Sequence, residues 1–347
     1  MKHKVGTGMR YGAIVLVVGV LCLWQAAAEE NDDIMRNTER FYTIISRDAV
    51  PELVLDGAVS KPGLTFTEGP SWLGGKLYFS NYYMFWKEWK SSDEGGLIVI
   101  NADGSHTVLN KDVQTCGTIP LPNGNLAVCD LINCSIVEMT PAGKMVRTLA
   151  DSFDGKRLGR PNDIIVDAKG GIYFTDPNNG PKWKDNMPGN AIYYLGPGGA
   201  LKKVTGWNDF DFPNGCVLSP DGGTFYVNDS GPTSVWMYDV GVDGSLSNRR
   251  LFTDVRMPDE LMKGKNPRSN ADGMTIDTLG NVYIALPPGV EIFDKTGGYI
   301  GVIVFPQPPS NCIFGGDDMK TLYATCRDRI YKLRTNVPGL AYPPKEK

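Results

Sequence analysis

Histidine is almost absent from this sequence, and several kinds of active site depend on it. The 347 residues include two histidines, His3 and His106. His3 lies in a segment that we expect to be removed, and His106 lies in a predicted outer strand, where we expect a surface residue. One remaining histidine excludes a multi-histidine zinc site, and its expected place in an outer strand argues against a Ser-His-Asp triad.

The sequence also lacks a strong charge of one sign and a phosphate-binding loop. Its formal net charge is -4, which gives no reason to expect nucleic acid or an anionic membrane surface as a partner. Glycine-rich pieces such as Gly315-Gly316 do not have the phosphate-loop pattern and no predicted helix follows them.

Long apolar runs are missing, and the one at the N-terminus is short for a membrane span. Ala13–Trp24 is apolar, follows a basic stretch with Arg10, and precedes the small residues Ala26-Ala27-Ala28. These features predict a signal peptide over residues 1–28. We therefore expect an exported protein, periplasmic or secreted, without membrane contact after cleavage; a retained anchor is the alternative.

Six cysteines follow the predicted signal peptide, and their spacing does not match a zinc ribbon. They are Cys116, Cys129, Cys134, Cys216, Cys312 and Cys326. An even number in an exported chain permits disulfides, for example across a hairpin tip. Buried free thiols are the alternative, because a domain of this size does not depend on disulfides. The pairing stays open.

A repeat of short apolar segments dominates the rest of the chain. Six similar segments recur at intervals of 40 to 57 residues: Lys76–Ser80, Asn125–Cys129, Gly171–Thr175, Thr224–Asn228, Asn281–Ala285 and Thr321–Thr325. Turn signals such as Pro122-Asn123-Gly124 precede most of them, and further strands follow. Four short strands at this period predict an all-β fold, a six-bladed β-propeller around a central channel. A β-sandwich or two β-domains is the alternative.

The repeat sets the expected domain boundaries. Residues 29–50 form an N-terminal arm, exposed or disordered, with a helix predicted near Met35–Ser46. Residues 51–340 form the propeller, and residues 341–347 form a C-terminal tail. Glu52–Leu55 precedes the first blade and Arg329–Leu333 ends the last, so we expect these two strands to pair and close the ring.

Polar residues recur about ten positions before each of the six segments, where the innermost strand of a blade begins. They are Glu68, Cys116, Asn162, Asn214, Asp272 and, less closely in phase, Asn311. Because innermost strands line the channel, these residues should meet at one mouth. At any single position an Asn or Asp before a strand is more simply a turn former.

The chemistry of four of these residues indicates a metal site. Glu68, Asn162, Asn214 and Asp272 offer hard oxygen donors, which suit Ca²⁺, Mg²⁺ or Mn²⁺. Two carboxylates brought together repel each other, and a cation removes that cost. We predict one divalent cation at these four residues, Ca²⁺ first, with Mg²⁺, Mn²⁺ or Zn²⁺ as alternatives.

Four short motifs give this chain a family resemblance. Glu68-Gly69-Pro70, Arg160-Pro161-Asn162-Asp163, Pro213-Asn214-Gly215 and Ala271-Asp272-Gly273-Met274 resemble the senescence-marker-protein/gluconolactonase/luciferin-regenerating-enzyme family of six-bladed propellers. Segment Asn311–Gly316 is similar to the bacterial gluconolactonase branch. The resemblance covers roughly residues 50–340. Cys116-Gly117 departs from the Asn-Gly often found there, and the loop Met257–Ser269 looks longer than usual.

The resemblance implies a metal-dependent lactone hydrolase that opens a sugar-acid lactone. It implies that Glu68, Asn214 and Asp272 bind the metal, that Asn162 contacts metal or substrate, and that Arg160 binds substrate. Asp272 would also be the catalytic acid/base. Two alternatives stay open: a phosphotriesterase or other esterase on the same metal site, and a non-catalytic binding propeller. The expected partner is a small sugar lactone, and the expected assembly is a monomer or dimer.

Overall fold

A computed structural model describes residues 37–61, 63–81, 95–101, 103–179, 187–256 and 268–345. The predicted signal peptide, residues 1–28, lies outside the described residues, as do the aromatic-rich loop 82–89 and most of the loop 257–269. Within the described ranges, the chain has no helix with the length and apolar character that a membrane crossing requires.

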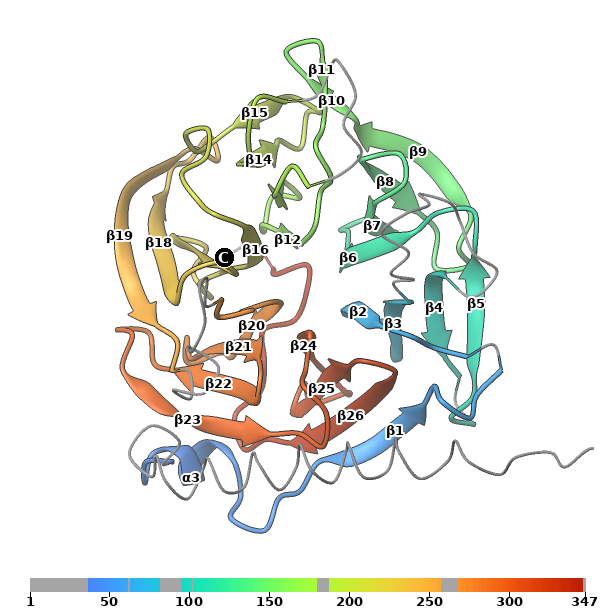
Figure 1. Ribbon diagram of the computed structural model, residues 1–347, viewed down its shortest axis with the longest axis vertical. Helices are drawn as coiled ribbons and strands as arrows, with labels where there is room; N and C mark the ends of the chain where they lie inside the picture. The colour runs from blue at the N-terminus through green and yellow to red at the C-terminus, as the bar shows by residue number, and fades with distance from the viewer. Residues whose placement is uncertain are drawn as a thin grey trace, which may run out of the picture.

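Six four-stranded antiparallel sheets make up the described part of the chain, and they stand around a common centre as the blades of a propeller (Figure 1). This confirms the predicted fold. The first three blades are β2 (Thr67–Leu73), β3 (Lys76–Asn81), β4 (Gly96–Ile100), β5 (His106–Asn110); β6 (Thr115–Pro120), β7 (Leu126–Asp130), β8 (Ser135–Met139), β9 (Met145–Ala150); and β12 (Ile164–Val166), β13 (Ile172–Asp176), β14 (Ala191–Leu195), β15 (Leu201–Lys203).

The other three blades follow the same order from the centre outward, except that the last borrows its outer strand. They are β16 (Pro213–Leu218), β17 (Thr224–Asp229), β18 (Ser234–Val240), β19 (Leu246–Asp254); β20 (Met274–Ile276), β21 (Val282–Leu286), β22 (Gly289–Phe293), β23 (Tyr299–Val304); and β24 (Asn311–Gly315), β25 (Thr321–Cys326), β26 (Arg329–Arg334), β1 (Glu52–Asp56). A small hairpin, β10 (Ser152–Phe153) and β11 (Lys156–Arg157), lies outside the blades.

The ring is closed by β1, the first strand of the described chain. It pairs antiparallel with β26, with Leu53 opposite Tyr331 and Leu55 opposite Ile330, and in Figure 1 the blue strand lies beside the red blade. The predicted closure is thus confirmed. Closure leaves no blade with an unpaired seam at the join.

Apolar side chains are packed between neighbouring blades, which explains why the middle residues of the second strands are mainly apolar. All five residues of β13 are buried, because this strand has a blade on each side. Tyr173 of β13 packs on Phe225 of the next blade, with ring centroids 5.0 Å apart. Outer strands such as β9 are largely exposed. The hydrophobic effect therefore stabilises the ring mainly at the blade interfaces.

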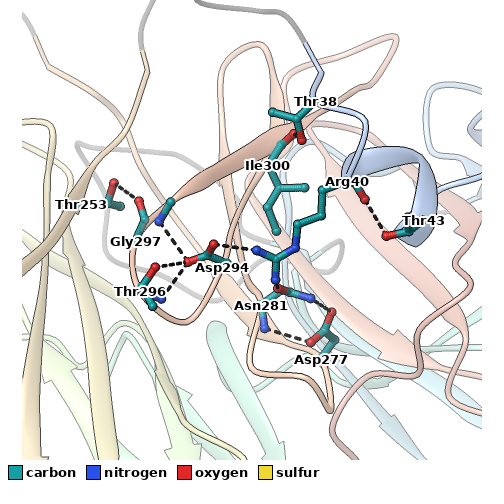
Figure 2. Close-up of polar contacts among 11 residues, drawn as sticks. Thr38, Arg40, Thr43, Thr253, Asp277, Asn281, Asp294, Thr296, Gly297 and Ile300 are labelled. Atoms are coloured by element: carbon teal, nitrogen blue, oxygen red, sulfur yellow. Dashed lines mark hydrogen bonds and ion pairs between the residues drawn. The ribbon is translucent and has the colours of Figure 1, made fainter.

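The segment before β1 packs on the fifth blade. Its helix α3 (Phe41–Ile44) is shorter than the predicted Met35–Ser46 and buries Phe41 and Ile44. Arg40 forms a 2.6 Å ion pair with Asp294 and donates to Asn281, whose side chain is held by Asp277 (Figure 2). The described part of the arm is therefore bound to the propeller surface.

The end of the chain enters the middle of the ring (red segment in Figure 1). Backbone hydrogen bonds of 2.9–3.0 Å join Thr278 to Pro338 and Leu340 to Ile276. Tyr342 then packs against apolar clusters from opposite sides of the propeller and lines a small cavity among the innermost strands. The C-terminal segment thus occupies one end of the channel.

The cysteines are buried free thiols. All six that the structure describes, Cys116, Cys129, Cys134, Cys216, Cys312 and Cys326, are unpaired. In the last blade, Cys312 is opposite Ala324 and Cys326 lies at the far end of β25. The alternative of free thiols is therefore the one that the structure has.

Candidate active site

Five of the six predicted entrance residues line one cavity at a mouth of the channel. Glu68, Cys116, Asn162, Asn214 and Asp272 share this cavity of about 400 Å³ with Arg160. The sixth residue, Asn311, lines a separate space of about 20 Å³ deeper in the channel. It reaches the site from below, because its Nδ2 donates to Glu68 Oε2 at 3.2 Å.

Local irregularities in the innermost strands direct these side chains toward the cavity. The pairing register shifts between Glu68 and Ser71 in β2 and between Pro213 and Cys216 in β16. Such a bulge turns the strand and redirects its side chains. Gly69 has a positive φ of 47° and lies so close to the neighbouring blade that a Cβ would be 1.9 Å from the Cys116 carbonyl oxygen. Only glycine fits there.

Acidic or amide side chains at the ends of second strands hold the loops that carry the site. Asp176 accepts hydrogen bonds from the backbone amides of Gly159 and Arg160, at 2.7 and 2.8 Å. Asp229 accepts two at 2.7 Å from the loop before Asn214. Sequence reasoning missed these residues, although the signal was present: Asn81, Asp130, Asp176 and Asp229 end second strands in consecutive blades.

Hydrogen bonds between neighbouring blades fix the site residues relative to one another. Gly117 N donates to the Asn162 carbonyl at 2.9 Å, and Gly273 N donates to the Ser310 carbonyl at 2.8 Å. The Ser310 hydroxyl donates to the Thr67 carbonyl at 2.6 Å. Residues from blades far apart in the sequence are thus held in one arrangement before any ligand binds.

Two carboxylates, Glu68 and Asp272, face this cavity in a poorly solvated environment. Glu68 is 5% exposed and accepts from Gly69 N at 2.9 Å; burial raises its pKa. Burial, the Glu68 carboxylate and the Asp163 carboxylate raise the pKa of Asp272 well above its usual value. Two such groups are stable together only with a shared proton or a bound cation.

The two asparagines supply neutral oxygens beside the carboxylates. Asn214 donates through Nδ2 to Ser230 Oγ at 2.9 Å, and its buried Oδ1 has no hydrogen-bond partner among the described residues. Asn162 Oδ1 accepts from the Cys116 thiol at 3.6 Å. Burial and the Glu68 carboxylate raise the pKa of that thiol, so Cys116 stays neutral and orients Asn162.

This donor set fits a hard divalent cation. A buried, unsatisfied amide oxygen is costly unless a ligand takes it up, and the adjacent carboxylates supply the charge that Ca²⁺ or Mg²⁺ requires. Within the described ranges, no group of three or more His, Cys, Asp or Glu side chains could hold a metal ion. A site here therefore depends on the amide oxygens as well as the carboxylates.

Three arginines surround the carboxylates, and sequence reasoning identified one of them. Arg160 is 5% exposed and lines the cavity. Arg268 lies at the rim, 3.6 Å from Asp211. Arg327, in the turn between β25 and β26, lies with its guanidinium 5.0 Å from the centre of the Phe66 ring. Neither Arg268 nor Arg327 lies in a recognisable sequence motif. Arg268 directly follows residues 257–267, which lie outside the described ranges, and Arg327 is a turn residue.

Comparisons with known proteins show the family and agree with the fold. A family model described as the SMP-30/gluconolactonase/LRE-like region matches residues 66–327. The gluconolactonase of Zymomonas mobilis is 29% identical over 310 residues, which cover 84% of this chain and 85% of that protein.

Solved structures give the same picture. A gluconolactonase from Xanthomonas campestris superposes with a TM-score of 0.71 at 26% identity, over 87% of this chain and 94% of that one. Regucalcin from Agrobacterium tumefaciens, described as a calcium-binding protein, has a TM-score of 0.65 at 17% identity, over 86% and 98% of the two chains. Regucalcin therefore shares the fold of this chain.

Proposed function

The chain belongs to the SMP-30/gluconolactonase/LRE-like family, and on this premise we propose that it is a metal-dependent hydrolase that opens a sugar-acid lactone. Lactone hydrolysis is supported by the family and by the relatives named gluconolactonase. The metal, the sugar-acid substrate and the roles of individual residues belong to the proposal.

One observation carries the proposal of a metal. Two carboxylates in a poorly solvated cavity stand beside a buried amide oxygen, Asn214 Oδ1, without a partner in the described part of the chain. Glu68, Asn162, Asn214 and Asp272 would hold one divalent cation, with Ca²⁺ the best match to their hard oxygens. A cation bound there would polarise the lactone carbonyl and stabilise negative charge on its oxygen.

Asp272 is the proposed proton carrier. Its carboxylate takes a proton from the water that attacks the lactone carbonyl carbon, and the proton is then delivered to the ring oxygen as the ring C–O bond breaks. A carboxylate that lines the cavity beside the bound lactone can accept this proton and return it. Arg160 and Asn162 hold the hydroxyls of the substrate.

The proposed location is outside the cytoplasm, on the strength of the predicted signal peptide. Sequencing the N-terminus of the mature protein from a fractionated culture tests this: a start near Glu29 is expected, and a start at Met1 in the cytoplasmic fraction contradicts it.

A hydrolysis assay with and without a chelator tests the activity. Metal-loaded protein should open D-glucono-1,5-lactone faster than the spontaneous rate, chelation should abolish the difference, and added Ca²⁺ should restore it. Full activity in chelator would contradict the metal. Hydrolysis of phosphotriesters alone would favour the rival hydrolase, and inactivity on every lactone would favour a binding propeller.

A further inference from the structure

Among the described residues that line the cavity, positive side chains outnumber negative ones. Arg160, Arg268 and Arg327 lie with Glu68 and Asp272, which gives this lining a net charge of +1 when all five are ionised and Asp211, 3.6 Å from Arg268, is not counted. The further step rests on the proposed function: a divalent cation held by the two carboxylates would raise the net charge to +3. A cavity of that charge favours an anion over a neutral sugar lactone.

Arg327 lines the cavity, and the carboxylate with which it interacts electrostatically is Asp272, beyond ion-pair distance. In the described part of the chain, no carboxylate lies within ion-pair distance of its guanidinium. Most other arginines described there form ion pairs with carboxylates, at 2.6 to 3.6 Å: Arg40, Arg47, Arg147, Arg250, Arg268, Arg329 and Arg334. Arg249 and Arg256 also form no ion pair with described residues and lie on the rings of Trp236 and Tyr299, but of these three arginines it is Arg327 that lines the cavity.

The position of Arg327 is nevertheless well defined. Its guanidinium lies over the Phe66 ring, and the backbone amide of Phe66 is held by the Asn81 side chain at 3.2 Å. Thr67 N donates to the carbonyl of Arg327 itself. A guanidinium that lies on an aromatic ring in the lining of the cavity suits ligand recognition better than solvation.

We infer that the substrate is a lactone that carries an anionic group, such as a phosphate or carboxylate, away from its ring carbonyl, and that Arg327 binds this group. The planar guanidinium can donate two parallel hydrogen bonds to either anion. Arg268 lies at the same rim and adds long-range attraction, although Asp211 partly offsets it. The alternative role for Arg327 is to balance the charges of Glu68 and Asp272.

Matched lactones test this inference. The kcat/KM of calcium-loaded protein is measured, at low salt and after subtraction of spontaneous opening, for D-glucono-1,5-lactone, its 6-phosphate and its 6-carboxylate analogue. At least tenfold preference for one or both anionic lactones is expected, decreasing as salt is added. The two anionic compounds distinguish phosphate from carboxylate. Equal kcat/KM for all three would overturn the inference.

Variants separate recognition from charge balance. Arg327→Gln should raise KM for the anionic lactone at least tenfold more than it raises KM for the neutral lactone, and Arg327→Lys should restore part of the preference. Arg250→Gln, which breaks an exposed ion pair on β18 and β19 with Asp239, is the matched control. If Arg327→Gln lowers hydrolysis of neutral and anionic lactones equally, Arg327 only balances Asp272 and the inference is wrong.

A binding experiment keeps the inference testable if no lactone is hydrolysed. Calorimetry compares D-glucitol with D-glucitol 6-phosphate, which have no lactone ring. The phosphate should bind wild-type protein at least tenfold more tightly than glucitol, and Arg327→Gln should remove this difference. Equal affinity for the two compounds would overturn the inference, whereas inactivity on lactones alone would count against the proposed function.

Discussion

Replacing Glu291 by Gln should stabilise the protein at high pH, although Glu291 is not part of any of the four family motifs. The residue is fully buried in β22. One carboxylate oxygen accepts from Arg256 N at 3.0 Å, and the other has no partner among the described residues. Burial raises its pKa to about 8. An ionised carboxylate in this place is therefore costly.

The sign and size of the predicted change in unfolding free energy follow from the difference between the pKa of Glu291 in the folded and unfolded states. In the unfolded chain Glu291 ionises near its ordinary pKa of about 4.3–4.5, whereas the folded protein keeps it protonated until about pH 8. The unfolded state thus binds fewer protons between these values, so Glu291 makes stability fall as pH rises. At about 1.4 kcal/mol per pKa unit, the loss between pH 5 and pH 9 is on the order of 4 kcal/mol.

The assay is urea unfolding of wild-type protein and Glu291→Gln across pH 5 to 9. The advantage of the variant over wild type should grow by about 4 kcal/mol over this range. Glu138→Gln is the control, because this change should destabilise the protein. Burial opposes ionisation of Glu138, but hydrogen bonds from Asn125, Arg147 and Asn123 outweigh burial and lower the pKa of Glu138. Glu138 therefore stabilises the fold throughout pH 5 to 9, and its loss should cost stability evenly.

A flat difference between Glu291→Gln and wild type would refute the reasoning. It would mean that Glu291 ionises in the folded protein as it does in water, and that solvent or a cation reaches its free oxygen.

The other predictions concern the site and the ring. Asp272→Asn, measured on metal-saturated protein, should lose roughly 10²–10⁴-fold in kcat; near wild-type turnover would show that the proton is carried elsewhere. Arg160→Ala should mainly raise KM, since a substrate-holding residue acts on ground and transition states alike; an unchanged KM would remove it from the binding site. Glu68→Gln should weaken Ca²⁺ binding by calorimetry, and chelation should lower the Tm of wild type more than that of the variant; equal shifts would exclude Glu68 as a ligand. Deleting residues 1–56 should lower the Tm by opening the ring, whereas deleting residues 1–28 should not; equal Tm values would contradict closure by β1.

The blades could be predicted from the sequence because their signal is local and repeated. Each predicted second strand agrees with the observed one to within one residue at either end, for example Thr224–Asn228 against β17 (Thr224–Asp229). The β10–β11 hairpin was missed because its strands are short and exposed. The Asp154-Gly155 pair between them was a usable signal for a two-residue turn.

The site could be predicted only as far as the repeat extends. Asn311 was placed with the other entrance residues but lies deeper, because β24 pairs with β25 in regular register from Asn311 onward. At Glu68 and Asn214 the register shifts instead. The position of a residue within the sequence repeat does not reveal whether the strand has a bulge there. Arg327 was missed because it is an ordinary turn residue until the ring brings it beside Phe66.

Tyr342 and the C-terminal segment close the inner end of the proposed active-site cavity. Between the cavity and this segment lies a space of about 20 Å³, enough for about one water molecule and too small for a sugar to pass. Substrate and product therefore cannot pass through the inner end of the channel, and the described residues leave the rim that Arg327 borders for their exchange. If the substrate is the anionic lactone inferred above, its hydroxy-acid product leaves past the same positive charge that attracted the lactone, so tight binding and fast release are opposing demands on Arg327.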